Sequence, residues 1–169
     1  MIATAPIPRA SRQELLPNGE TVSDTRRVIR YWRLDDDGRL LMGGRGPYAE
    51  ANSANAWHHL ARCVHNYFPA LRDIPFTHRW GGRVAMHIDY LPRLHRPHPG
   101  LLIAIGCQGR GIAWQTAMGA ELARLATDPH HDPVLPISPI KPIAFHPLKA
   151  LGVAATIATF RALDRFGFS

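Results

Sequence analysis

GCQGRGIAWQTAMGAELARL, residues 106–125, is the stretch that decides how the middle of this chain folds. It follows LLIAI at 101–105, an apolar run of strand length. After the glycines, Ile112, Met118 and Leu125 recur at the spacing of a helix. The sequence therefore predicts a strand, a glycine-rich turn and a helix whose first N–H groups point back at the turn. Such helix ends attract negative charge, and glycines allow a ligand to approach the backbone closely.

Two phosphate-binding motifs do not explain this turn. A P-loop requires Gly-Lys-Ser/Thr at its end, and Gly111-Ile112-Ala113 has neither the lysine nor the hydroxyl. A dinucleotide fingerprint requires G-x-G-x-x-G within a β-α-β unit, whereas Gly106, Gly109 and Gly111 are spaced differently. A tight turn without a ligand remains open, because an isolated glycine motif is weak support for a site.

The composition indicates a globular protein with a basic surface. With 169 residues and 46% apolar residues, the chain has enough material for one ordinary domain or two small lobes. The formal charge of +7 raises the possibility of nucleic-acid or anionic-polymer binding. However, the arginines are spread along the chain and no nucleic-acid-binding motif is present, so we expect no nucleic-acid partner.

The chain shows no features of secretion, membrane insertion or metal binding. Cys63 and Cys107 do not make a disulfide framework, and the first residues do not resemble a signal peptide, so we expect a cytoplasmic protein. The uncharged stretch 150–160 is too short to span a bilayer. His59 and Cys63 are four residues apart but lack further ligands at suitable spacing, so we expect no metal site.

A β-hairpin is predicted over residues 25–44, where TRRVIRYWRL and RLLMGG flank the turn sequence DDDG. Alternation places Trp32 and Leu34 on one face with Arg30, and Tyr31 on the other face with Arg33. The pattern suits a sheet with a core on one side and a polar pocket on the other. An ordinary sheet with snorkelling arginines remains the alternative.

The rest of the chain alternates short strands and helices. Residues 1–8 read as a strand, 11–20 as one helical turn, 51–71 as a helix capped by Asn52 or Ser53, and 75–97 as a strand pair or a long bent strand. The last helix, 148–166, carries an apolar stripe that we expect to dock on a groove. This stripe consists of Leu151, Ala155, Ala158 and Ala162.

Several collinear motifs together resemble a known family. RWGGRVAMHIDYLPRL (79–94), followed by the strand, turn and helix of 101–125, resembles the C-terminal part of the FAD-dependent D-amino acid oxidase superfamily. More narrowly, it is similar to the group of glycine/D-amino acid oxidases and gamma-glutamylputrescine oxidoreductases. YWRLDDDGRLLMGGRG (31–46) resembles the substrate-domain hairpin of the same family, and the likeness covers most of residues 1–127 in order.

The resemblance implies that the turn faces the isoalloxazine ring of FAD. Negative charge develops on the ring when it takes up a hydride, and a helix N-terminus at that edge stabilises it. The family form is G-[aromatic]-S-G-H-G, from which Cys107 and Arg110 depart; residues 80–94 contain no cysteine, so we expect noncovalent FAD. The implied cofactor-binding residues are Gly81, Gly82, Arg83, Gly106, Gln108, Gly109, Arg110, Gly111, Ile112 and Ala113.

The resemblance also implies a reaction, the oxidation of a small amine or amino acid by hydride transfer to FAD. Tyr31, Trp32 and Arg45 are the substrate-contact residues expected from the position of the hairpin, with Arg45 able to pair with a carboxylate. Proton-transferring side chains are often dispensable in this family, so no catalytic residue is named. The alternative is a non-catalytic remnant or protein-interaction module.

The resemblance further implies that part of the enzyme is absent, since the family's N-terminal G-x-G-x-x-G does not occur in this sequence. We expect a C-terminal portion that is inactive in isolation and binds FAD weakly or not at all, with the missing N-terminal half or a second copy as partner. The expected fold is α+β, a mixed or antiparallel substrate-domain sheet with packed helices plus the last strand–helix unit of an FAD domain. Its expected parts are an FAD-domain strand and connection (1–20), a substrate-binding sheet and helix (21–98), an FAD-domain strand–turn–helix (99–127), and a proline-rich loop with the C-terminal helix (128–169).

Overall fold

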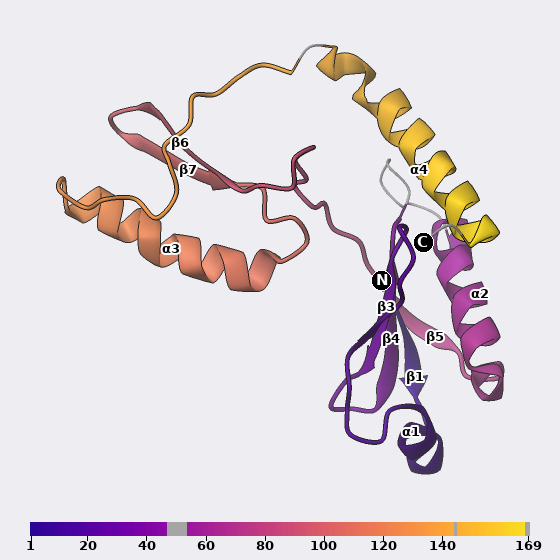
Figure 1. The fold of residues 1–169 in the computed structure, drawn as a ribbon. Helices are drawn as coiled ribbons and strands as arrows, with labels where there is room; N and C mark the ends of the chain where they lie inside the picture. Colours follow the sequence, from indigo (N-terminus) through magenta and orange to yellow (C-terminus); the bar gives the residue numbers. More distant parts are fainter. Residues whose placement is uncertain (47–53, 144, 168–169) are drawn as a thin grey trace. The chain divides into compact units, whose positions relative to one another are not determined.

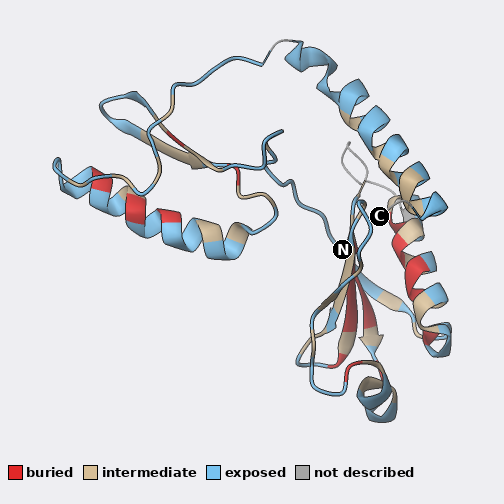
Figure 2. Cartoon of the chain, in the orientation of Figure 1, coloured by how far each residue is buried: buried red, intermediate tan, exposed pale blue. Residues whose placement is uncertain are grey.

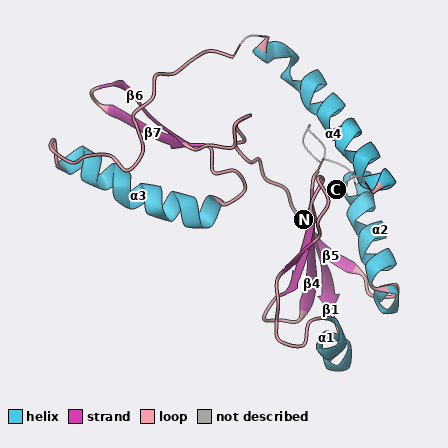
Figure 3. Cartoon of the chain, in the orientation of Figure 1, coloured by secondary structure: helices cyan, strands magenta, loops and turns pink. Residues whose placement is uncertain are grey.

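The computed structural model describes residues 1–46, 54–143 and 145–167. The chain forms two compact units, one of Met1–Gly81 with Phe145–Ser169 (unit 1) and one of Gly82–Ala144 (unit 2). Both are built from antiparallel sheets and helices, with four α-helices among the described residues (Figures 1 and 3). The fold is thus α+β with antiparallel sheets, as the sequence predicts.

Unit 1 contains a five-stranded sheet in the order β2-β3-β4-β1-β5. Its strands are β1 (Ile2–Pro6), β2 (Val22–Ser23), β3 (Arg30–Leu34), β4 (Arg39–Gly44) and β5 (Phe76–Arg79). The predicted hairpin is confirmed, because β3 and β4 pair antiparallel. The outgoing strand starts later than expected, since Asp24 Oδ1 accepts the N–H groups of Arg26 and Arg30 and closes a loop before β3.

The core of unit 1 lies between this sheet and helix α2 (His58–Tyr67), which follows the short helix η1 (Ala54–Trp57) and precedes η2 (Pro69–Leu71). Helix α1 (Arg9–Leu15) joins β1 to β2, with no buried residue. Figure 2 shows the buried positions of unit 1 gathered on the sheet and on one side of α2. The cap expected at Asn52 or Ser53 lies outside the described residues. The buried cluster consists of Ile2, Ile7, Leu40, Met42, Trp57, Leu60, Cys63, Val64 and Leu71.

The two faces of β3 differ as the alternation predicts. The ring centroids of Trp32 and Tyr67 lie 5.4 Å apart, and those of Trp32 and Phe68 5.9 Å apart, so this face packs against the helical layer. Arg30 shares the face and donates a hydrogen bond to the Tyr67 hydroxyl at 2.9 Å. Tyr31 lies on the other face, over Gly43, where a side chain would collide with its ring. Arg30 is therefore tolerated on the core face because the Tyr67 hydroxyl pairs with its guanidinium.

Unit 2 consists of a hairpin and a long helix. Strand β6 (Arg93–His98) pairs antiparallel with β7 (Leu101–Ile105), and α3 (Gly111–Thr127) follows the glycine turn. The predicted strand 101–105 and the predicted helix are confirmed. Neither the long bent strand nor the strand pair expected over 75–97 is formed, because residues 80–92 adopt no regular element, β5 pairs with β1, and β6 pairs with β7. Pro97 lies inside β6, where a register shift between His95 and His98 takes it out of the ladder.

The proline-rich loop after α3 is fixed to that helix by one carboxylate. Glu121 is 2% exposed, and its Oε1 accepts the Val134 N–H at 3.0 Å and His131 Nε2 at 3.1 Å. The Val134 N–H is the main cause of the lowered pKa of Glu121, with His131 adding to it. The sequence does not indicate the role of Glu121, because a single acidic residue in a helical pattern gives no information about its hydrogen-bond partners.

We expect the loop to detach from α3 in acid. A depressed carboxyl pKa means that the stabilisation is complete above the ordinary value of 4.5 and is lost as the pH falls through the lower, folded-state pKa. The protection of the Val134 amide against hydrogen exchange, measured as the ratio of the intrinsic to the observed rate at each pH, should therefore fall sharply below that pH. In an E121Q variant, this protection should already be low at neutral pH and should change little with pH. A wild-type protection factor that does not fall in acid would contradict the assignment.

Helix α4 (Lys149–Phe166) is present as predicted, but its predicted docking face is wrong. Leu151 and the three alanines of the predicted stripe are exposed, and the half-buried apolar residues are Val153, Ile157, Phe160 and Leu163. Larger side chains hide more apolar area than alanines do, so they set the rotation of the helix. Asp164 reinforces this rotation by accepting the N–H groups of Arg27 and Val28 at 2.9 and 3.1 Å. No helix in the described part of the chain is long and apolar enough to cross a membrane.

Candidate functional site

The turn between β7 and α3 is built on left-handed backbone. Gly106, Gln108 and Gly109 have φ values of 88°, 51° and 83°, and the Arg110 N–H closes the turn on the Cys107 carbonyl at 2.8 Å. A Cβ at Gly106 would lie 2.7 Å from His87 Cε1, so this glycine is covered by the chain itself. A Cβ at Gly109 would have no atom within 4 Å. Gly109 is therefore the point at which a ligand can reach the backbone.

The partial positive charge at the N-terminus of α3 is not compensated by a capping side chain or by an acidic residue. Arg110 precedes the helix without a side-chain capping bond, and the first turn contains no acidic residue. The Trp114 N–H is the first to bond within the helix, to the Arg110 carbonyl at 3.0 Å. The preceding N–H groups, of Gly111, Ile112 and Ala113, are those that a helix leaves for an external acceptor. Ile112 is 90% exposed, so the apolar stripe predicted for this helix does not include it.

Gln108 is the feature of the turn that most directly indicates a ligand. Its backbone N–H donates to the Ala85 carbonyl at 3.3 Å, which holds segment 82–86 beside the turn. Both polar atoms of its side-chain amide are buried, and neither has a hydrogen-bond partner among the described residues. Buried side-chain amides nearly always have partners, and an orphaned one has a cost. Beside an open glycine and an uncapped helix, this amide fits a polar ring edge such as that of a flavin.

The other predicted cofactor residues lie before this turn in the sequence. A Cβ at Gly81 would lie 3.3 Å from Trp57 Cη2, whereas Gly82 has nothing within 4 Å. Arg83 is exposed. Gly82 and Arg83 belong to unit 2 together with residues 106–113, and Gly81 closes the first segment of unit 1.

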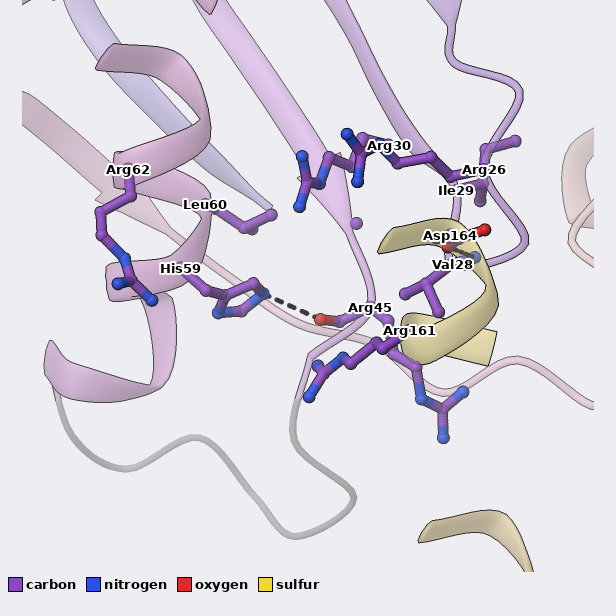
Figure 4. Close-up of a pocket in the computed structure, with 11 residues that line it drawn as sticks. Arg26, Val28, Ile29, Arg30, Arg45, His59, Leu60, Arg62, Arg161 and Asp164 are labelled. Atoms are coloured by element: carbon purple, nitrogen blue, oxygen red, sulfur yellow. Dashed lines mark hydrogen bonds between the residues drawn. The ribbon is translucent and has the colours of Figure 1, made fainter. Parts of the chain in front are cut away.

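The predicted substrate residues do not share one cavity. Tyr31 and Trp32 point to opposite faces of the sheet, and Trp32 is occupied by packing against Tyr67 and Phe68. Arg45, just after β4, lines a pocket of about 310 Å³ in unit 1 that includes neither aromatic residue (Figure 4). We call this the arginine pocket; it is lined by Arg26, Val28, Ile29, Arg30, Gly44, Arg45, His59, Leu60, Arg62, Arg161 and Asp164.

One hydrogen bond at this pocket connects α2 to the segment after β4. His59 Nε2 donates to the Arg45 carbonyl at 2.9 Å (Figure 4). Burial lowers the pKa of His59, and the charges of Arg161 and Arg30 add to the lowering, while the bond to the Arg45 carbonyl opposes it. No local sequence pattern indicates this pocket, because its lining residues come from positions up to 138 apart (26 to 164).

The sequence of this chain matches one protein family and several known proteins. The model of the FAD-dependent oxidoreductase family (DAO) matches residues 1–125. Over 113 residues, 67% of this chain, the sequence is 38% identical to the probable oxidoreductase OrdL of Rhizobium meliloti (strain 1021). It is 30% identical over 113 residues to the probable oxidoreductase OrdL of Haemophilus influenzae. It is 24% identical over 125 residues, 74% of the chain, to the gamma-glutamylputrescine oxidoreductase of Escherichia coli (strain K12).

These matches cover only part of each relative. The chain spans 26%, 25% and 29% of the lengths of the three proteins, about a quarter in each case. No solved structure matches the chain significantly.

Proposed function

Since the chain belongs to the family of FAD-dependent oxidoreductases, we propose that it supplies the flavin-edge and substrate-side parts of an enzyme that oxidises an amine or amino acid. The whole enzyme requires in addition a site for the ADP half of FAD, because the G-x-G-x-x-G that would bind it does not occur in these residues. The name of the Escherichia coli relative, which includes a polyamine derivative, supports an amine-bearing substrate.

The orphaned amide of Gln108 beside open Gly109 is the observation that carries this proposal. In it, the amide and the N–H groups of Gly111, Ile112 and Ala113 hold the polar edge of the ring, and Gly109 leaves room for the ring. The Arg110 N–H is used within the turn, so Arg110 contributes its side chain, and Gly82 and Arg83 of the same unit complete the proposed set. Gly106 is covered by His87, and Gly81 belongs to unit 1, so neither is included. FAD, when bound, supplies the hydride acceptor. The helix N-terminus then favours the negative charge that this chemistry places at the ring edge.

On the substrate side, we propose that Arg45 binds a carboxylate, while Tyr31 and Trp32 belong to the same hairpin. A guanidinium suits this role because it can form two parallel hydrogen bonds with a carboxylate. Substrate binding and orientation are thus assigned to unit 1, and no side chain is assigned proton transfer.

Flavin binding tests the proposal directly. Titrating the purified chain into FAD and, separately, into riboflavin should quench the fluorescence of both, with similar affinities. The affinities should match because the proposed contacts are all to the ring that the two ligands share. Of the two outcomes expected from the sequence, weak binding and no binding, the proposal commits to weak binding. A chain that binds neither flavin at millimolar concentration would be better described as a non-catalytic interaction module.

Replacing Arg45 tests the substrate side. In flavin-loaded protein, R45A should weaken binding of a carboxylate-bearing amino acid about tenfold or more, the loss expected for hydrogen bonds to a charged group. It should leave binding of an amine without a carboxylate unchanged. The control is R33A, since Arg33 is exposed on β3 and its guanidinium donates to the Leu34 carbonyl instead. Unchanged amino-acid affinity in R45A would remove Arg45 from the site.

A further inference from the structure

We propose that the arginine pocket is a second binding site, for a small polyanion with two or more phosphate or carboxylate groups. The site goes beyond the flavin chemistry proposed above; it shares Arg45 with the proposed substrate side, so its test uses Arg62 and Arg161, which have no role there. It rests on the lining of one cavity within unit 1.

The charge of the lining is strongly unbalanced. Among the described residues, five arginines line the pocket, Arg26, Arg30, Arg45, Arg62 and Arg161, against the one carboxylate of Asp164. That carboxylate is already engaged by the N–H groups of Arg27 and Val28.

In the part of the chain that the structure describes, two of the five guanidiniums interact with an acidic residue, directly or through a hydroxyl. Arg26 lies 3.5 Å from Asp24, and Arg30 bonds the Tyr67 hydroxyl, which in turn faces Asp24 at 3.5 Å. Arg45, Arg62 and Arg161 form no ion pair with a described residue. Like charges held around one cavity repel each other, and a bound anion removes this repulsion.

The pocket is assembled by elements far apart in the sequence. Arg30 comes from β3, Arg45 from just after β4, Arg62 from α2 and Arg161 from α4, and all four line the same pocket (Figure 4). The His59–Arg45 bond ties α2 to the segment after β4, and the Asp164 bonds tie α4 to the residues before β3. The walls are therefore held by contacts that do not use the arginine side chains.

Size and charge select the class of ligand. A volume of about 310 Å³ lies at the lower end of the range for small-molecule sites, which disfavours a polymer. An ammonium group would be repelled by this lining, so the pocket does not suit the amine end of a substrate. A single carboxylate would leave several guanidiniums without a counter-charge. Phosphate and carboxylate groups each match the planar fork of arginine, so a ligand with several such groups satisfies the site.

Calorimetric titration with inorganic pyrophosphate and with citrate tests the proposal and distinguishes the two chemistries. The wild-type chain should bind at least one of them at physiological salt. The R62Q/R161Q variant should lose at least tenfold in affinity. Both side chains are exposed, so the fold should survive their replacement, which circular dichroism and the thermal midpoint will check.

The matched control is R72Q/R79Q, which removes two positive charges from exposed positions of unit 1 outside the pocket. It should bind like the wild type, whereas R62K/R161K, which keeps charge but loses the fork, should give an intermediate loss. Preference for pyrophosphate assigns a phosphate ligand, and preference for citrate a polycarboxylate. No binding by the wild type, or equal weakening in R62Q/R161Q and R72Q/R79Q, would overturn the proposal. Riboflavin quenching should be equal in all these variants, so failure here is distinguishable from failure of the flavin proposal.

Discussion

Replacing Gly106 with alanine is expected to lower the free energy of unfolding by about 3 kcal/mol, the sum of backbone strain and overpacking. The residue has a φ of 88°, which costs an L-residue side chain about 1–2 kcal/mol. The new Cβ would also lie 2.7 and 2.8 Å from His87 Cε1 and Nδ1. That ring cannot move freely, because His87 Nδ1 donates to the Leu91 carbonyl at 2.6 Å. Urea unfolding, followed by circular dichroism, measures the loss.

Gly109 provides the matched control for this prediction. Its φ of 83° is similar, but a Cβ there meets nothing within 4 Å, so G109A should carry the strain alone. The stability difference between G106A and G109A then reports the collision with His87. Equal destabilisation of the two variants would show that His87 does not cover the turn.

Replacing Gln108 with methionine is expected to stabilise the protein while weakening its affinity for flavin. Both polar atoms of the Gln108 amide are buried without a partner, a state that costs about 1–3 kcal/mol. Methionine has a similar length and no polar group to desolvate, so the free energy of unfolding should rise by an amount in that range. If the amide contacts the flavin edge, the same change should reduce flavin affinity about tenfold.

The control for this prediction is Q115M, on an exposed position of α3. It should change neither stability nor flavin binding. A Q108M protein that is less stable than the wild type would mean that the amide has a partner within the chain. A Q108M protein that is more stable but binds flavin unchanged would mean that the amide serves the turn and not the ligand.

Local elements of this fold could be predicted from the sequence, because they depend on patterns within about 20 residues. The strand at 101–105, the helix after the glycines and the hairpin of β3 and β4 all follow from such patterns. The rotation of α4 did not follow, because alanines at helical spacing carry little burial energy compared with Ile157 or Phe160. The strand pair or long bent strand expected over 75–97 did not follow either, because a strand requires a pairing neighbour that the described chain does not provide over 80–92.

The sites divide in the same way. The glycine turn could be found from its spacing, but the orphaned amide of Gln108 could not, since the spacing does not show which side chain is buried by a turn with positive φ at Gly106, Gln108 and Gly109. The arginine pocket has no local pattern, because β3, β4, α2 and α4 each contribute separate residues. Resemblance to a family led to the flavin, and the matches to residues 1–125 confirm that family.

We propose that the first N–H groups of α3 bind the polar edge of a flavin ring. An NMR titration of the ¹⁵N-labelled chain with FAD tests this contact residue by residue. At up to millimolar FAD, the account predicts that the largest amide shift changes fall on Gly109, Arg110, Gly111, Ile112 and Ala113. Unperturbed amides at these five positions, whether flavin binds elsewhere or not at all, would contradict it.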